Sequence, residues 1–388
     1  MFLEATWKRN SKLIEASIDF HHQGYISPNT YVVDLDTVKQ NATILAREAK
    51  KQDIELFFMT KQLGRNPLVA KTIVEAGIEK AVAVDPWEAI TLYNHGIPIG
   101  HVGHLVQIPK CMVHSILTLH PDYITVFSYE NARIISDIAL EVGRRQKVFL
   151  RIADLDNFIY DGQKGGFTNQ QLLREIDELI QLEGIEIAGL TSFPCLLIKE
   201  DEVEPTPNVQ SMLKAKELLK RKGFSNIEMN MPSATSTDTL PLLKELGATQ
   251  GEPGHAFTGS TPFHAAKDLP ECPAMVYVSE VSHVYDRHSY VFGGGFYPRS
   301  RVEHALLGTN INNVKEVEAI ENNPSNIDYY GTLNTNKARV GDTVIYAFRT
   351  QAFVTNAQLA IVKNLNSKPE LIGIYDAMGN QIDRKSVV

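Results

Sequence analysis

The sequence has little cysteine and no long apolar run. Cys111, Cys195 and Cys272 stand far apart, which excludes a disulfide framework and a Cys-x-x-Cys metal pair. No stretch approaches the roughly 20 apolar residues that a membrane-spanning helix needs. The first residues mix charges throughout and lack the apolar segment of a signal peptide. We therefore expect a reduced, cytoplasmic protein with no membrane partner.

An excess of positive charge is also missing. The 38 lysines and arginines are outnumbered by 46 aspartates and glutamates, for a formal net charge of −8. Because a basic surface is what draws a protein to nucleic acid or to an anionic membrane, we expect neither as a partner. Apolar residues make up 43% of the chain and charged residues 22%, a balance that allows a large core.

Short apolar runs alternate with helix-like segments from residue 55 onward. The runs resemble parallel strands buried on both faces, and the segments between them show helical spacing and often end in glycine. Eight strands with intervening helices predict a parallel (β/α)8 barrel of the TIM type. An open doubly wound sheet is the alternative that fits the same alternation. The eight runs are LFFMT, AVAVD, GHVGHLV, YITVFS, KVFLRIA, IEIAGLTSF, NIEMNMP and ATQGEPG.

The pattern changes after residue 270. Residues 271–388 are rich in valine, tyrosine and threonine, with turn signals between the runs, and this composition predicts a β domain. Residues 36–270 form the predicted barrel domain. We expect residues 1–35 to be an N-terminal segment that packs partly with the β domain.

Reactive side chains are concentrated where the predicted strands end. The site of a TIM-type barrel lies at the C-terminal ends of its strands. Lys61 is the most informative of these side chains, because a charged lysine at the end of a buried strand is costly away from water. The set contains no cluster of metal-binding carboxylates, and we expect no metal. Its members are Lys61, His104, Lys164, Ser192, Phe193, Cys195, Ser233, Thr235, Ser236, Glu252, Gly254 and His255.

These residue types fit pyridoxal 5′-phosphate. Partial desolvation supplies a neutral lysine amine, which can form a Schiff base with the cofactor's aldehyde. Backbone N–H groups at Gly254 and His255, together with serine hydroxyls, suit the phosphate. A carboxylate at the far edge suits the pyridine nitrogen.

The motifs, in their order along the chain, resemble those of fold-type III pyridoxal-phosphate enzymes. The likeness covers nearly the whole chain and extends to alanine racemase and to the ornithine and diaminopimelate decarboxylases. It is greatest for the YhfX-like group, which is related to alanine racemase. The motifs that carry it are TYVVDLDTVKQNATIL, MTK, SFP, NMPSATS, GEPGHAFTG and FGGGFYPR.

The resemblance implies a role for several candidates. Lys61 would bear the cofactor, as the lysine of the first strand end does in the family. Glu252 stands where the decarboxylases place the carboxylate that meets the pyridine nitrogen and where the racemases place an arginine. Ser233 and Ser236 fall in the phosphate segment, and capping of the next helix is compatible with that role.

Other candidates keep a structural alternative. Phe193 stands where racemases have a histidine stacked on the cofactor ring, and a core phenylalanine is the alternative. His104 is either a cofactor neighbour or a core histidine. Lys164 stands near the racemase arginine that touches the cofactor, and a solvated loop lysine is the alternative. For His283 and His288 we favour surface or sheet positions over metal binding.

The resemblance breaks at the second acid/base group. Gly293 stands at the position of the partner-subunit tyrosine of racemases, and Tyr297 matches only the later tyrosine of that motif. The Cys-Asp pair of the decarboxylases is missing, since the nearest stretch offers Asn334. Neither well-known reaction is therefore carried over with its full set of residues.

The resemblance predicts an enzyme that acts at Cα of an amino acid or a similar substrate. We expect a racemase or epimerase, with a lyase or decarboxylase as the alternative and a non-catalytic cofactor-binding protein as the alternative of another class. The β domain favours an enzyme, because the barrel-only relatives that regulate cofactor supply lack it. The family also implies a head-to-tail homodimer. Candidates for a substrate carboxylate or phosphonate are Arg299, Arg301 and Arg349, and solvated surface arginines are the commoner alternative.

Overall fold

The computed structural model describes residues 2–199, 201–296, 300, 302–323 and 325–382. The chain divides into two compact units. The barrel unit comprises Thr43–Thr60 and Ile73–Gly254, and the sheet unit comprises Met1–Ala42, Lys61–Thr72 and His255–Val388.

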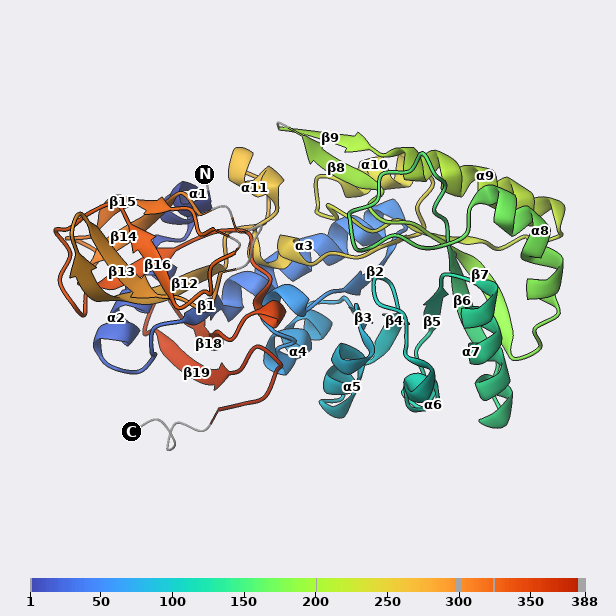
Figure 1. Ribbon diagram of the computed structural model, residues 1–388, viewed down its shortest axis with the longest axis horizontal. Coiled ribbons are helices and arrows are strands. Elements are labelled where there is room, and N and C mark those ends of the chain that lie inside the picture. The colour runs from blue at the N-terminus through green and yellow to red at the C-terminus, as the bar shows by residue number, and fades with distance from the viewer. Residues whose placement is uncertain (1, 200, 297–299, 301, 324, 383–388) are drawn as a thin grey trace. The chain divides into compact units, whose positions relative to one another are not determined.

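Eight strands close into a barrel in the barrel unit (Figure 1). Every pair of neighbours is parallel, and the last strand of the ring pairs with the first. This closed ring confirms the TIM-type barrel expected from the sequence. In order around the barrel the strands are β10 Glu228–Asn230, β11 Gln250–Gly251, β2 Glu55–Phe58, β3 Lys80–Ala83, β4 Ile99–Val102, β5 Tyr123–Val126, β6 Gln146–Arg151 and β7 Ile185–Thr191.

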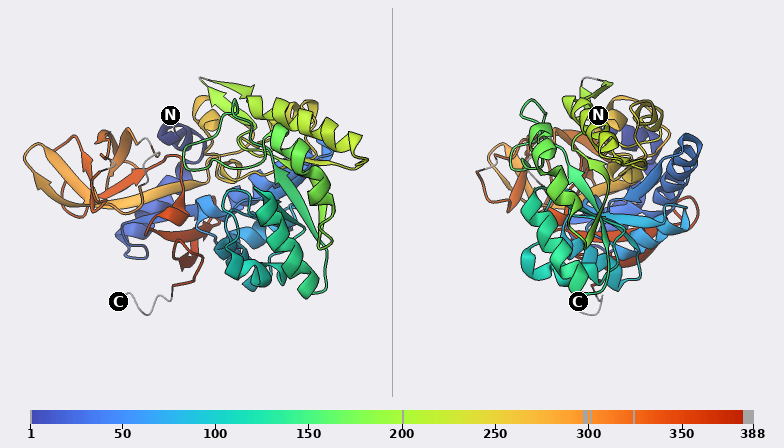
Figure 2. Two further views of the ribbon diagram at one scale, coloured as in Figure 1. Left: turned by 45° about the vertical axis from the view of Figure 1, so that its right-hand side comes forward. Right: turned by 90° about the vertical axis from the view of Figure 1, so that its right-hand side faces the viewer.

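Helices connect these strands and lie outside the barrel (Figure 2). Their first turns carry expected caps: Asp85 and Ser128 each accept a hydrogen bond from a backbone N–H three residues on, and Thr168 forms a capping box with Gln171. Among the described residues, no helix is long and apolar enough to cross a bilayer. The helices are α5 Pro86–Asn94, η2 Lys110–Met112, α6 Val113–Leu117, α7 Tyr129–Glu141, α8 Asn169–Ile180, α9 Pro207–Arg221 and α10 Leu240–Glu245, with α3 Leu35–Gln52 and α4 Pro67–Glu75 running across the division between the units.

A hairpin interrupts the alternation of strands and helices after β7. Strand β8 (Leu196–Lys199) pairs antiparallel with β9 (Glu202–Pro205) before α9 begins. No pattern in the sequence predicted this pair. The hairpin matters for the site because it follows directly on Phe193 and Cys195, at the C-terminal end of β7.

Apolar side chains fill one part of the barrel interior. Phe57, Val82, Tyr123 and Phe149 come from four different strands and form one buried cluster with Met59 and Val84. The rings of Tyr123 and Phe149 are stacked, with their centroids 4.3 Å apart. The shared face of these strands therefore packs inward, as the short apolar runs of a barrel require.

The sheet unit is built on nine strands. All neighbouring strands pair antiparallel except one pair. This confirms the expected β domain. The exception is the N-terminal strand, which pairs parallel with one neighbour and antiparallel with the other. In sheet order the strands are β13 His288–Phe292, β16 Tyr330–Leu333, β15 Lys315–Ile320, β14 His304–Gly308, β17 Thr343–Tyr346, β12 Met275–Tyr285, β1 Thr30–Asp34, β18 Gln358–Lys363 and β19 Glu370–Tyr375.

Helix α2 packs on this sheet and completes its core. It runs from Ser11 to His22, and Leu13, Ile14 and Ile18 on its inner face belong to the same buried cluster as Val276 and Ile345 of the sheet. The cluster is apolar throughout. The remaining helices of the unit are α1 Phe2–Arg9, α11 Pro262–Ala266, η1 Lys61–Leu63, η3 His255–Thr258 and η4 Ala352–Val354.

Candidate active site

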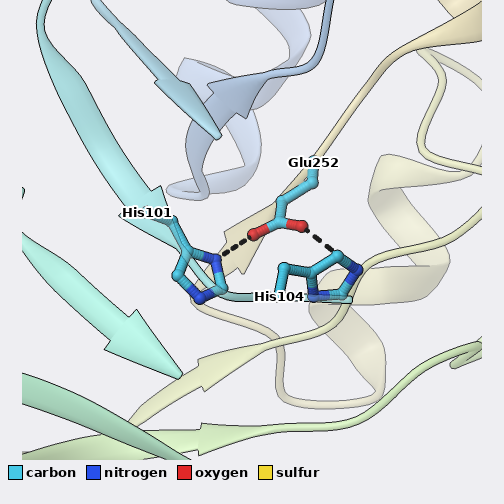
Figure 3. A group of neighbouring side chains, drawn as sticks. All are labelled: His101, His104 and Glu252. Atoms are coloured by element: carbon cyan, nitrogen blue, oxygen red, sulfur yellow. Dashed lines mark hydrogen bonds and ion pairs between the residues drawn. The ribbon is translucent and has the colours of Figure 1, made fainter. Parts of the chain in front are cut away.

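Glu252 is a buried carboxylate at the C-terminal end of barrel strand β11. It follows the strand directly, and 4% of its surface is exposed. His101 on β4 lies with Nδ1 2.6 Å from Oε1 of Glu252 (Figure 3). Asn230 at the end of β10 donates through Nδ2 to the same oxygen at 2.9 Å. Two strands thus direct hydrogen bonds at one carboxylate oxygen.

Each of these two donors is oriented by a threonine on a neighbouring strand. Thr125 of β5 lies with its hydroxyl 2.6 Å from Nε2 of His101. Thr191 of β7 donates its hydroxyl to Oδ1 of Asn230 at 2.8 Å. The Thr191 bond turns the amide N–H2 of Asn230 toward Glu252. A neutral His101 that accepts from Thr125 likewise presents its Nδ1–H to Glu252.

These contacts determine the charge of the carboxyl group. Burial by itself raises the pKa of Glu252, but the imidazoles of His104 and His101 and the hydrogen bonds from His101 and Asn230 lower it to about 2. Glu252 is therefore ionised at neutral pH. Among the described residues, Oε2 of Glu252 accepts no hydrogen bond, and Nε2 of His104 lies 3.6 Å away. One oxygen is held by the barrel while the other keeps capacity for a further donor.

The same group has the composition of a metal site. His101, His104 and Glu252 are all buried, and their ligand atoms lie within 4.8 Å of one another (Figure 3). Two imidazoles and a carboxylate are a set that binds Zn²⁺ in other proteins. In this structure, however, Nδ1 of His101 is hydrogen-bonded to the carboxylate, so that pair of atoms is used within the group.

The structure brings one further predicted residue, Phe193, into contact with this group, and Ser192 and Cys195 lie beside it in the chain. The ring of Phe193 meets the ring of His104 edge to face, with 5.3 Å between centroids. Phe193 is half-buried, whereas Cys195, two residues on, is fully buried. Burial raises the pKa of the Cys195 thiol far above its ordinary value, so it is held as a neutral thiol. Ser192 donates its hydroxyl to the carbonyl oxygen of Ile152 at 2.8 Å.

The segment after β10 has an unusual backbone. Ser233 and Ala234 both have positive φ, at 109° and 51°, a region that residues other than glycine seldom adopt. The hydroxyl of Ser233 donates to the carbonyl of Leu196, and that of Ser236 lies 3.3 Å from Thr239 Oγ1. The buried hydroxyl of Thr235 has no hydrogen-bond partner in the described part of the chain. Helix α10 begins at an N-cap formed by Thr239, so neither serine is its N-cap residue.

Lys61 opens η1 of the sheet unit and is half-buried. It follows Thr60, which ends the first segment of the barrel unit and donates its hydroxyl to the buried carboxylate of Glu88 at 2.7 Å. The chain is therefore tied to the barrel at the residue before the lysine. Lys61 is the third residue after β2, as expected for a strand-end position.

His255, Arg349 and Lys61 form a basic group within the sheet unit. Burial lowers the pKa of His255 well below its ordinary value, and the positive charges of Arg349 and Lys61 lower it further. Nε2 of His255 lies 2.8 Å from the carbonyl oxygen of Thr350, to which a neutral imidazole donates. A neutral histidine near two cationic side chains suits an anionic group such as phosphate.

The remaining predicted residues lie elsewhere. Lys164 is exposed, with 73% of its side chain accessible, and its Nζ lies 3.5 Å from Asp161. His283 stacks on Tyr290 in the β12–β13 hairpin. The backbone N–H of Gly293 donates to the carbonyl of Tyr329. Three residues singled out in the sequence lie outside the described residues: Tyr297, Arg299 and Arg301.

Family models match most of the chain. Residues 33–262 match the alanine racemase N-terminal domain, and residues 276–371 match the YhfX-like C-terminal domain. The chain therefore belongs to the alanine racemase-like proteins with a YhfX-like C-terminal domain. It is 40% identical over 386 residues to the uncharacterized protein YhfX of Escherichia coli K12, covering 98% of this chain and 100% of that protein. An alanine racemase of Clostridium perfringens SM101 is 24% identical over 274 residues, 68% of this chain and 67% of the racemase.

Solved structures with different activities share the fold. The alanine racemase of Clostridium difficile 630, in complex with cycloserine, has a TM-score of 0.65 at 18% identity and covers 90% of this chain and 98% of its own. The D-threonine aldolase of Filomicrobium marinum has a TM-score of 0.66 at 14% identity, with coverages of 91% and 95%. The D-threo-3-hydroxyaspartate dehydratase of Delftia sp. HT23 has a TM-score of 0.66 at 15% identity, with coverages of 91% and 97%. At these identities the likeness shows the fold alone.

Family membership confirms the cofactor expected from the sequence, because the alanine racemase family depends on pyridoxal 5′-phosphate. The described residues fit this group. The ionised Glu252 has an oxygen without a hydrogen bond in the described residues, which suits a ring N–H. The Thr235 hydroxyl is buried without a partner there, which suits a phosphate oxygen.

Proposed function

We propose that this protein is a pyridoxal-phosphate-dependent enzyme that acts at Cα of an amino acid or a similar substrate, with racemisation or epimerisation as its reaction. The observation that carries the cofactor-dependent part of the proposal is the ionised, buried Glu252, held through Oε1 by His101 and Asn230. The choice of racemisation rests on the resemblance to alanine racemase. Burying an ionised carboxylate in a barrel is expensive, and the protein offsets that cost with converging hydrogen bonds. A buried ionised group that is held in this way is typical of a functional site.

In this proposal each residue has one task. Lys61 would hold the cofactor through Nζ. Glu252 would accept the pyridine N–H at Oε2 and would keep that nitrogen protonated, since an adjacent negative charge favours the charged form. The cofactor, when bound, supplies the electron sink for bond breaking at Cα. His101 is a positioning residue, because it acts through Glu252.

The phosphate is assigned to three kinds of group. The basic side chains near His255 supply positive charge, the backbone of Gly254 and His255 supplies N–H donors, and the segment around Thr235 supplies a hydroxyl. Phe193 and His104 are assigned to the neighbourhood of the ring. Lys164, which is exposed, keeps the solvated-loop alternative.

A lyase or decarboxylase is the second candidate function. A carboxylate at position 252 favours it, because a protonated ring withdraws electrons more strongly than the unprotonated ring that an arginine would leave. The absence of a tyrosine at Gly293 points the same way, since the sequence lacks the residue that racemases use as the second acid/base. The aldolase and the dehydratase that share the fold support the breadth of this chemistry.

The first experiment locates the cofactor. Borohydride reduction followed by peptide mapping should fix the cofactor on the peptide that contains Lys61, and Lys61→Ala should be colourless. Lys12→Ala is the matched control, because Lys12 is exposed and paired with Glu15, and it should stay yellow. Fixation at a different lysine would overturn the assignment.

The second experiment determines the reaction. The protein is incubated in deuterium oxide with single amino acids, and Cα exchange, inversion and carbon dioxide release are followed together. Exchange with inversion supports the racemase, whereas loss of carbon dioxide or cleavage of the side chain supports the second candidate. A holoprotein that exchanges no amino acid would favour a non-catalytic cofactor-binding protein.

The proposal includes a head-to-tail homodimer in the cytoplasm. In the family the β domain of one chain covers the barrel of its partner, and obligate interfaces of this kind usually bury more than about 2,000 Å². Sedimentation of the active protein should give twice the mass of one chain. A fully active monomer would exclude this arrangement.

A further inference from the structure

Arg151 is a buried arginine that the sequence analysis did not single out. It ends barrel strand β6, and 1% of its surface is exposed. In the register of the barrel it lies opposite Thr191 of β7, which in turn lies opposite Asn230 of β10. Thr191 and Asn230 belong to the hydrogen-bond network of Glu252. Arg151 also lies two residues beyond Phe149 of the inner cluster, so it occupies the inward-facing row at the C-terminal end of the barrel.

The guanidinium of Arg151 has few partners for a buried charge. Nη2 donates to the carbonyl oxygen of Gln163 at 2.8 Å, and the group lies over the ring of Phe127, 4.5 Å from its centroid. In the described part of the chain, Nε and Nη1 have no hydrogen-bond partner, and no carboxylate forms an ion pair with this side chain. Burial lowers the pKa of Arg151 to about 10, so the group is still cationic at neutral pH.

The loop that follows holds the arginine in place. The backbone N–H of Phe167 donates to the carbonyl oxygen of Arg151 at 2.8 Å. Gly166 has a φ of +129°, and a Cβ there would come within 2.7 Å of that same oxygen. Gly165 has a φ of +144°, and a Cβ there would come within 2.8 Å of the Phe127 ring. Two glycines thus let the loop pack closely against the backbone of Arg151 and against the Phe127 ring over which its guanidinium lies.

We propose that Arg151 binds an anionic oxygen group of a small molecule at the C-terminal end of the barrel. An uncompensated buried charge is strongly unfavourable, and guanidinium N–H donors that lack protein partners are suited to carboxylate or phenolate oxygens. Two sources supply that chemistry: the carboxylate of the amino-acid substrate and the phenolic oxygen of the cofactor. The choice between the sources rests on the proposed function, whereas the binding of an anion by Arg151 does not.

The first test needs no turnover. The protein as purified is titrated with sodium propionate against sodium chloride at equal ionic strength, and thermal unfolding is followed. Propionate should raise the melting temperature of the parent protein and leave that of Arg151→Met unchanged. Arg145→Met is the matched control, because Arg145 is exposed on the same segment, and it should respond like the parent. A variant that propionate stabilises as much as the parent would overturn the proposal.

The second test separates the two sources. Glycine and methylamine differ by a carboxylate, and their binding to the holoprotein is followed by the cofactor's absorbance. If Arg151 holds the substrate carboxylate, Arg151→Met should weaken glycine binding by about ten- to a hundredfold and leave methylamine binding unchanged. If it holds the cofactor oxygen, the variant should shift the absorbance band and weaken cofactor binding, with the ratio of glycine to methylamine affinity preserved.

A second variant serves as the control for folding. Arg151→Lys keeps the charge but loses the planar fork, so it should fold and show an intermediate loss of affinity. A structural role for Arg151 would appear as lower stability of both variants at every propionate concentration, with glycine and cofactor binding unchanged. That outcome would contradict the proposal whether or not the protein turns over amino acids.

Discussion

An apolar cluster in the sheet unit and the polar strand ends of the barrel unit are two buried centres of different kinds. The core of the sheet unit is apolar and brings α2 together with β12 and β17 through residues such as Ile14, Val276 and Ile345. The barrel unit also has an apolar cluster, around Phe149, but it buries a charged and polar group at the ends of its strands, around Glu252 and Arg151. The apolar cluster around α2 is therefore a structural core, although the sheet unit also buries polar pairs such as His264 with Glu271. The strand ends of the barrel carry charged groups that cost stability.

Buried apolar groups and buried charged groups differ in the partners that they need. Apolar burial stabilises by about 25 cal/mol per Å² and needs no partner of a particular kind. A buried carboxylate or guanidinium is tolerated only with hydrogen bonds or an opposite charge. Glu252 obtains these from the barrel itself, and Arg151 obtains few of them from the described residues. The polar end of the barrel is therefore the place where the proposed ligand would supply the missing partners.

The largest expected effect comes from a substitution in the apolar cluster of the sheet unit. Ile345 is fully buried in the core of the sheet unit. Ile345→Ala should lower the free energy of unfolding by about 2–5 kcal/mol, because it removes buried methylene groups and leaves a cavity. Ile327→Ala, at a position that is 71% exposed, should change it by no more than about 0.5 kcal/mol. Urea unfolding measures both, and equal effects would show that the cluster is not a packed core.

The next largest effect is expected from a substitution at the polar strand ends of the barrel. Glu252→Gln should keep the cofactor and lose roughly ten- to a hundredfold in the rate of Cα exchange, because a charged hydrogen bond of about 1.5–3 kcal/mol is lost. The amide keeps the shape of the carboxylate, so the change in stability should be smaller than that of Ile345→Ala. Glu186→Gln, on the exposed face of β7, is the control. Normal turnover by Glu252→Gln would reduce Glu252 to a structural residue.

Acid should lower the stability of the sheet unit by protonating one histidine, His21. His21 of α2 is buried, and burial, aided by the charge of His22, lowers its pKa to about 4. Its Nδ1 lies 2.8 Å from Thr343 Oγ1, and its Nε2 lies 3.1 Å from Glu280. Because the unfolded chain binds this proton more tightly, the stability conferred by neutral His21 is complete above pH 6.5 and is lost as the pH falls toward 4. We expect a loss of about 2 kcal/mol between pH 7 and pH 5.

Two variants check this assignment in urea unfolding at several pH values. His21→Asn should flatten the pH dependence in that window. The exposed neighbour offers a control, so His22→Asn should leave most of the slope in place. A slope that survives His21→Asn would assign the acid sensitivity to another group.

The smallest expected effect sharpens the polar network. Thr125→Val removes the hydroxyl beside Nε2 of His101, so His101 should be less well oriented toward Glu252. The rate of Cα exchange should fall about two- to tenfold, in line with one neutral hydrogen bond. Thr125→Ser retains the hydroxyl and should restore most of the rate and its pH profile. If valine and serine behave alike, Thr125 serves packing alone.

Much of the fold could be predicted from the sequence, because it depends on local patterns. Apolar runs of strand length, separated by amphipathic segments that end in glycine, predict parallel strands with connecting helices, and eight such runs favour a barrel over an open sheet. Lys61 and Glu252 were predicted as site residues for a similar reason, since each lies at the end of such a run. The hairpin β8–β9 was missed, because short antiparallel pairs in a connecting loop leave little periodic signal.

The sequence by itself thus determined the two kinds of architecture, the family and its cofactor, and the lysine and the glutamate proposed to meet that cofactor. Only the tertiary structure decided that His101, Thr125, Asn230 and Thr191 form one network with Glu252. A polar residue inside an apolar run, such as His101 or Arg151, indicated a buried polar site. The alternation along a strand indicates only which face of the sheet such a side chain takes, and not its partners. Its partners come from strands up to about 150 residues apart, and their register exists only once the barrel closes.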